Sequence, residues 1–178
     1  MKTARTILVL LALATPVLAQ DKPTPPTLKS VLLAQLKPTH IDKDWFVSVN
    51  VAIADLTSDQ ANWTDGKGNH SVAQLTTHLI FWNESLLADF NGTKKPEFSG
   101  NNDETFSKVD AKTWQATVKR IDELLSTWEK AIETADEAKL NDWYANIAKM
   151  GAHNAYHIGQ IVVMRKAQSS WDAEKGVK

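Results

Sequence analysis

The sequence contains no cysteine among its 178 residues. This absence excludes disulfide bonds, thiolate metal ligands, a cysteine nucleophile and haem attached through a CxxCH motif. A large charge excess is also lacking, because 20 basic residues stand against 21 acidic ones. Without a basic stripe to hold a phosphate backbone, nucleic acid is not an expected partner. The stability of the fold must therefore come from packing, to which a bound metal ion can add.

Long apolar runs are almost absent. The exception is Ile7–Leu13, which is short for a bilayer span and follows the positive residues Lys2 and Arg5. Small residues up to Ala19 complete the pattern of a signal peptide over residues 1–19. An N-terminal membrane anchor is the alternative, and the lack of a following cysteine excludes a lipid anchor. We expect an exported protein, periplasmic or secreted, without stable membrane insertion after signal cleavage.

Composition divides the remaining chain into three parts. Residues 20–27 hold three prolines and are expected to form an extended lead-in. Residues 28–170 are long enough for one domain with a substantial core. Residues 171–178 are expected to form a tail. With residues 1–19 removed, 18 basic and 21 acidic residues give a mild net charge of −3.

Four stretches of the chain carry apolar residues at the three- and four-residue spacing of an amphipathic helix. The first is expected to begin after Asp42, with Trp45 on its apolar stripe. A shorter helical piece over residues 28–36 is expected to stop before Pro38, because proline interrupts helix hydrogen bonding.

The other three stretches begin with good helix caps. Ser71 and Gln74 have the spacing of a capping box, and this helix is expected to end at Gly92. The third helix follows Asp110, an N-cap residue, and the fourth is expected to begin near Asp142.

A long polar segment, Thr93–Val109, separates the second and third helices and is broken by Pro96 and Gly100. A connection of this length permits both helices to run in the same direction. No stretch shows the alternation of a β-strand. The sequence therefore predicts an all-α fold, a four-helix bundle with a long crossover between helices 2 and 3.

Three of the five histidines fall on the inward faces of these helices. His153 and His157 are four residues apart and lie one above the other on a single helix face. His78 lies on the apolar stripe of the second helix, between Leu75 and Trp82. Three imidazoles that reach one point can bind a divalent ion and leave coordination positions open, as catalytic metal sites do. We predict His78, His153 and His157 as metal ligands and assign no catalytic residue.

The other two histidines, His40 and His70, precede expected helix starts and need no special role. Asn154 occupies the position that a zinc protease with an HExxH motif fills with glutamate, and an amide cannot act as its general base. Protease chemistry of this kind is therefore not expected. Non-covalent haem ligation, with His78 paired to Met150 or Met164, stays open as an alternative.

The chain resembles the DinB-like superfamily of four-helix metalloproteins. The resemblance rests on Ser71-Val72-Ala73-Gln74-Leu75-x-x-His78-Leu79 and on His153-x-x-x-His157-x-Gly159-Gln160, and extends over Leu28 to Lys166. It implies that the three histidines bind a divalent ion, zinc or nickel, with solvent completing the shell. Relatives include metal-dependent hydrolases and transferases that use low-molecular-weight thiols. Such thiols are not expected outside the cytoplasm, so an export signal disfavours the thiol-transferase reaction here.

Two functional hypotheses follow. The first is an exported DinB-like metalloprotein that acts as a metal-dependent hydrolase or transferase on an unknown small molecule. The alternative is a non-catalytic binding or stress protein in which the metal is mainly structural, because no nearby carboxylate offers itself as a general base. The resemblance also implies a homodimer.

Overall fold

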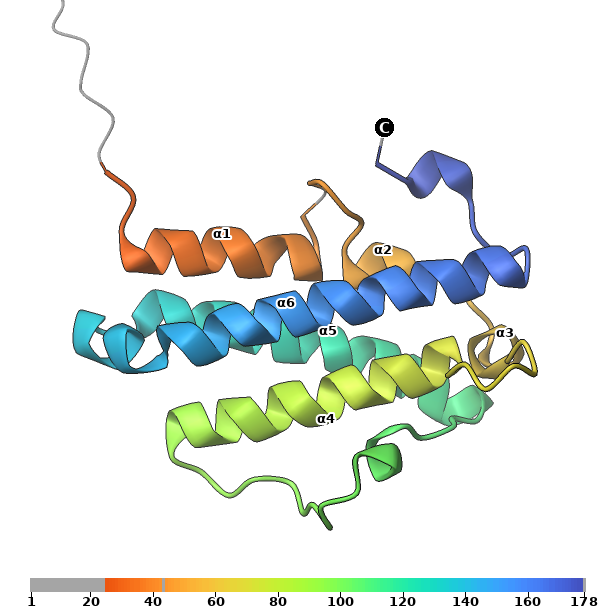
Figure 1. Ribbon diagram of the computed structural model, residues 1–178, viewed down its shortest axis with the longest axis horizontal. Coiled ribbons are helices and arrows are strands. Elements are labelled where there is room, and N and C mark those ends of the chain that lie inside the picture. The colour runs from red at the N-terminus through yellow and green to blue at the C-terminus, as the bar shows by residue number, and fades with distance from the viewer. Residues whose placement is uncertain (1–24, 43, 178) are drawn as a thin grey trace, which may run out of the picture.

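The computed structural model describes residues 25–42 and 44–177, so the predicted signal peptide lies outside the described residues. Helices are its only regular elements within these ranges, which confirms the all-α prediction (Figure 1). The α-helices are α1 (Leu28–His40), α2 (Val49–Ile53), α3 (Ser58–Asn62), α4 (Val72–Asn91), α5 (Ala111–Thr134) and α6 (Glu137–Ala167). Two 3₁₀ turns, η1 (Asn102–Thr105) and η2 (Ala173–Lys175), complete the set.

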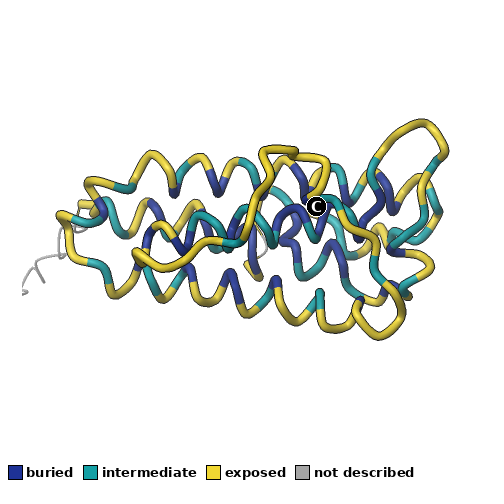
Figure 2. The backbone as a smooth tube through the Cα atoms, turned by 90° about the horizontal axis from the view of Figure 1, so that it is seen from below, coloured by how far each residue is buried: buried dark blue, intermediate teal, exposed yellow. Residues whose placement is uncertain are grey.

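The four longer helices, α1, α4, α5 and α6, lie side by side along the length of the molecule (Figure 1). Helix α6 packs against α1 and α4, and α5 packs against the same two helices from the other side. Helices α4 and α5 run in one direction while α1 and α6 run in the other, and the segment between α4 and α5 returns along the outside of α4 (Figure 1). Buried residues line the inner faces of all four (Figure 2).

The core has two parts. One lies around α2 and α3 and includes Ile53, Leu79 and Ile161, and the other lies around α1 and includes Leu36, Trp128 and Ile147. Along α6 the α1 part ends at Met150 and the α2 part begins at Ile158. The intervening stretch of α6, which carries His153 and His157, therefore lies at the junction between the two parts of the core.

Local capping explains where the predicted helices begin and end. The side chain of Ser71 accepts a hydrogen bond from the backbone of Gln74, whose side chain bonds back to the backbone of Ser71. Gly92 ends α4 with φ of 66°, a left-handed conformation that suits glycine. Asp110 caps α5. These boundaries agree with the prediction.

The prediction that the first long helix begins after Asp42 is wrong. The first long helix of the bundle is α1, which runs through Pro38 to His40, whereas the chain after Asp42 forms only the two short helices α2 and α3. Pro38 lies in the last turn, where proline removes a single backbone bond that packing against α5 and α6 outweighs. Ser48 and Thr57 each cap a new helix, so the backbone does not form one continuous helix.

Two further expectations need correction. Trp45 was predicted on a buried stripe, but it precedes α2 in irregular backbone and its side chain is 91% exposed. Helix α6 begins at Glu137, five residues before the predicted start near Asp142, because Asp136 caps it directly after α5. Glu137 and Ala138 are exposed and Leu140 is the first buried residue of α6, so the apolar spacing begins three residues after the helix does.

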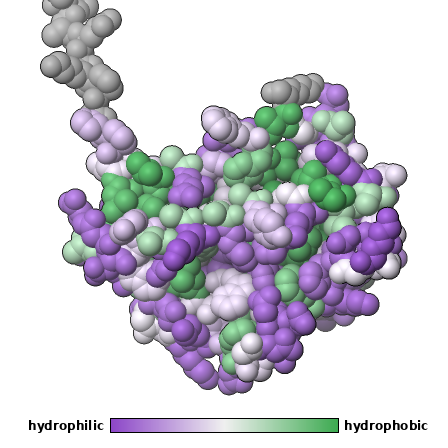
Figure 3. Space-filling model, viewed as in Figure 1, coloured by the Kyte–Doolittle hydropathy of each residue, from purple (hydrophilic) through white to green (hydrophobic). Residues whose placement is uncertain are grey.

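The outer surface alternates polar and apolar areas. Figure 3 shows apolar patches over α1 and over the C-terminal half of α6, where Val31 and Val163 are exposed. Among the described residues, no helix is long and apolar enough to cross a membrane.

Candidate metal centre

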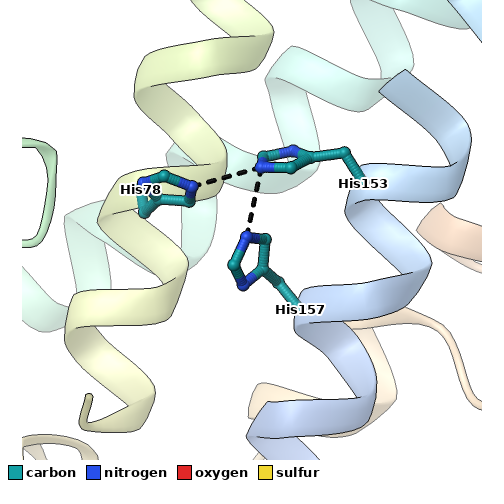
Figure 4. A group of neighbouring side chains, drawn as sticks. All are labelled: His78, His153 and His157. Carbon is teal, nitrogen blue, oxygen red and sulfur yellow. Dashed lines mark hydrogen bonds between the residues drawn. The ribbon is translucent and has the colours of Figure 1, made fainter. Parts of the chain in front are cut away.

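The three predicted histidines meet at one point between α4 and α6 (Figure 4). Nε2 of His153 lies 3.1 Å from Nε2 of His78 and 3.1 Å from Nε2 of His157. A ligand atom from each of the three lies within 4.8 Å of the other two. For comparison, two nitrogens bound to one tetrahedral zinc ion lie about 3.3 Å apart, given zinc–nitrogen bonds of about 2.0–2.1 Å. The spacing therefore fits a single divalent ion.

Burial keeps these rings neutral. His78 and His157 are buried, and His153 is half-buried. Burial lowers the pKa of His78 to about 3 and that of His153 to about 4, and the neighbouring imidazoles add to both effects. The pKa of His157 is also lowered, chiefly by burial. Neutral imidazole is the form that binds metal, so the cluster is ready to ligate at neutral pH.

Two outer hydrogen bonds determine which ring nitrogen carries the proton. The hydroxyl of Thr105 donates to the carbonyl oxygen of Asn102, so it accepts from Nδ1–H of His78 at 2.6 Å. The amide oxygen of Gln160 accepts from Nδ1–H of His157 at 2.6 Å. Both bonds leave the Nε2 lone pairs facing the cluster, which is the role that outer partners play in metal sites.

The Nε2 lone pairs that face one another in the cluster favour a bound cation. The ring of His153 has one Nε2 and can donate at most one hydrogen there, yet both His78 and His157 approach it. At least one of the two close contacts therefore joins two lone pairs. A divalent ion removes this repulsion, so the donor set fits a metal.

The comparison with known families agrees with this geometry. The sequence model of the DinB superfamily matches residues 47–163, which include all three histidines. The chain belongs to the DinB superfamily. No curated protein and no solved structure matches the chain. The match begins after α1, so it covers a narrower part of this DinB protein than the resemblance predicted from the sequence motifs.

A cavity of about 520 Å³ opens beside the histidines in this DinB protein. Its walls are mainly apolar, with Trp82 and Leu86 from α4 and Met150 from α6. Phe106 closes one side and stacks on the ring of His78, with ring centres 4.0 Å apart. Volumes of this order are typical of small-molecule sites. Trp82 thus lines a pocket next to the cluster.

Asn154 does not face the histidines. It is buried and exchanges two side-chain hydrogen bonds with Asn83 of α4, of 2.8 and 3.3 Å. Asn83 also accepts, through its backbone oxygen, the indole N–H of Trp128. The pair joins α4 to α6 next to the histidines and leaves no group in the position of a protease base. Met164, one alternative haem ligand, borders a different cavity from His78.

His40 is the residue that sequence reasoning misjudged. It lies in the last turn of α1, is 2% exposed, and bridges α1 to α5. Its Nδ1 lies 2.7 Å from a carboxylate oxygen of Glu129 and its Nε2 lies 2.9 Å from one of Asp122. The sequence predicts this role for His40 only if the first helix is expected to continue through Pro38, because that extension turns His40 toward α5.

His70 lies near the centre without joining it. Its ring stacks on Phe106 with ring centres 3.7 Å apart, so Phe106 lies between the rings of His70 and His78. His70 lines a separate cavity of about 470 Å³, together with Tyr156 and Gln160. It supports the aromatic wall of the centre.

Proposed function

We propose that this DinB protein is an exported metalloprotein in which His78, His153 and His157 hold one divalent ion, zinc or nickel. We further propose that it acts as a metal-dependent hydrolase or transferase on a small molecule. The observation that carries the proposal is the convergence of three neutral imidazoles at the end of an open, mainly apolar cavity. The four longer helices are then a four-helix bundle with a crossover between its second and third members, as in the predicted DinB-like fold.

The chain's own residues supply positioning and water exclusion. Thr105 and Gln160 hold protons on the outer nitrogens of His78 and His157, and thereby orient both rings. Phe106 and Trp82 cover the side of the centre toward the crossover segment. A divalent ion bound here would supply a Lewis acid and a more acidic bound water or thiol.

The cavity has no obvious general base. Within the described chain, no aspartate or glutamate lines it. This favours an attacking group that is acidified at the centre itself, or an external nucleophile, over proton removal by a side chain. The same observation supports the second candidate function, a binding or stress protein whose metal mainly ties α4 to α6.

A single set of measurements separates the two functions. Metal content is measured after purification without chelators, and the loaded protein is tested on a panel of esters, lactones and thiol acceptors. Turnover that is lost on chelation supports the enzyme. A sharp fall in melting temperature on chelation, with no turnover on the panel, supports the structural role. Protein that neither contains nor takes up a stoichiometric ion contradicts both.

Export rests on residues 1–19 alone and has its own test. The protein is recovered from its native host, and its N-terminus is read by mass spectrometry. We expect a mature chain that begins at Gln20 or Asp21 and is found outside the cytoplasm. An intact N-terminus in the cytoplasmic fraction contradicts export and leaves the metal site unaffected.

A further inference from the structure

We propose that the cavity beside the histidines binds a small organic anion with an apolar body, and that Lys149 contacts its anionic group. The inference rests on the proposed function, since it names the ligand class of the same cavity. Its basis is the placement of one cationic side chain at the rim of a mainly apolar cavity.

The apolar wall is held firmly in place. The indole N–H of Trp82 donates to the side-chain oxygen of Asn102 in η1 at 3.2 Å. Phe81 and Phe98 pack on the same indole, each with ring centres 5.3 Å away. A wall of this kind favours an aromatic or aliphatic ligand body, because it removes apolar surface from water at little ordering cost.

Charge at the rim has one sign. Lys149 is the only charged residue among those that line the cavity, and no ion pair involves it in the described chain. Its helical neighbours three and four residues away carry no negative charge; they are Ala145, Asn146, Ala152 and His153. Three neutral histidines would also leave the charge of a bound divalent ion uncompensated. The charge at this cavity therefore favours an anionic ligand.

The spacing limits the size of the ligand. Lys149 precedes His153 by one helical turn on α6, a rise of about 5–6 Å. A ligand that spans from the histidines to the Lys149 ammonium group thus needs an anionic group about 6–10 Å from its other end. Phenyl-substituted short-chain carboxylates have this length and this division into apolar body and anionic end.

The test uses 4-phenylbutyrate and its neutral analogue 4-phenylbutyramide. Each is titrated calorimetrically into zinc-loaded protein, whose metal content is measured first. We expect the acid to bind about tenfold more tightly than the amide, as a charge-assisted contact at a partly exposed site allows. In zinc-loaded Lys149→Gln this preference should fall to the part that the zinc ion supports, while amide binding is unchanged. Lys166→Gln removes an exposed lysine of the same helix outside this cavity and should retain the preference.

A second variant checks the location. Trp82→Leu should weaken acid and amide alike, with Leu86→Ala in its place if the first variant fails to fold. Equal affinity for acid and amide, a preference as large in Lys149→Gln as in the wild type, or affinities that neither wall variant changes would contradict the inference. The titrations are repeated on metal-free protein. If metal-free protein prefers the acid and this preference requires Lys149, the anion site is supported even when the protein proves to bind no metal. The two proposals can therefore fail separately.

Discussion

His40 and the cluster of three histidines in this protein have opposite surroundings. His40 lies between two carboxylates, from Asp122 and Glu129, and each ring nitrogen has an acidic partner. His78, His153 and His157 lie among one another, and their partners beyond the cluster are a hydroxyl, an amide and aromatic rings. The first arrangement is complete without any further ion, whereas the second leaves lone pairs facing one another.

The contrast shows that burial alone does not define a metal site. Each ring nitrogen of His40 lies within hydrogen-bond distance of a carboxylate oxygen, so neither is left to bind metal. In the cluster the outer nitrogens of His78 and His157 are occupied and the inner ones are free. His40 therefore cross-links α1 to α5, while the cluster is a ligand set. The predictions below test this division.

The largest expected effect is on metal binding. His153→Ala removes the ring that contacts both other histidines, and we expect zinc affinity to fall on the order of 10³-fold, about 4 kcal/mol. The metal-free variant should unfold within about 1 kcal/mol of the wild type, because the lost side chain is half-buried and its loss relieves a lone-pair contact. Zinc titration and urea unfolding in EDTA measure the two effects. A variant that keeps its zinc affinity would remove His153 from the site.

His40→Ala should produce the reverse pattern. Its loss leaves Asp122 and Glu129 without the buried ring that links them, and we expect the free energy of unfolding to fall by about 2–3 kcal/mol. Zinc affinity, measured under conditions where the variant is folded, should stay within about twofold of the wild-type value. Weakened zinc binding with unchanged stability would contradict the division between the two groups.

Gln160→Leu tests the outer hydrogen bonds of the cluster. Without the amide oxygen that accepts from Nδ1–H of His157, the ring is less well oriented, and zinc affinity should fall about 10- to 100-fold. Gln115→Leu, on the exposed face of α5, is the matched control and should have no effect. Equal zinc affinity in both variants would show that Gln160 does not position His157.

The smallest expected effect is a pH dependence of the metal-free protein. The pKa of His78 is lowered to about 3 and that of His153 to about 4, whereas the unfolded chain takes up these protons near pH 6.5. The unfolded state binds more protons in this window, so the free energy of unfolding decreases as the pH falls from about 6.5 to 4. We expect a loss of about 1 kcal/mol or more.

The control for this prediction is His153→Gln, in which the decrease should be smaller. Carboxylates with a lowered pKa, such as Asp122, lose their contribution only below their ordinary value of 3.8 and so act outside the window. A wild-type protein whose stability is constant from pH 6.5 to 4 would contradict neutral histidines in the cluster.

The three histidines of the centre could be predicted because the sequence features that indicate them lie close together along the chain. His153 and His157 share a helix face by spacing alone, and His78 lies on a clear apolar stripe between recognisable caps at Ser71 and Gly92. Pairing of α4 with α6 then brings the two helices' histidines together. Gln160 lies three residues after His157 on the same helix, whereas nothing in the sequence indicates that Thr105 would be an outer partner, since it reaches His78 from the crossover segment.

The first third of the fold was not predictable in the same way. Pro38 is a helix breaker in isolation, and only packing against α5 and α6 keeps α1 intact past it. The stretch after Asp42 has helical spacing, but Ser48 and Thr57 start separate helices and Trp45 stays in solvent. The role of His40 depends on this packing, which keeps α1 helical past Pro38. Its carboxylate partners, 82 and 89 residues away along the chain, were therefore not predicted.

Zinc stoichiometry of wild-type protein and of His157→Ala tests the central claim most directly. Both proteins are stripped with chelator, dialysed, titrated with zinc against a competing indicator, and checked for folding by circular dichroism. The account predicts one tightly bound zinc per wild-type chain and none at the same concentration in His157→Ala. A folded wild type that binds no stoichiometric zinc or nickel, or a variant that binds as tightly as the wild type, would contradict it.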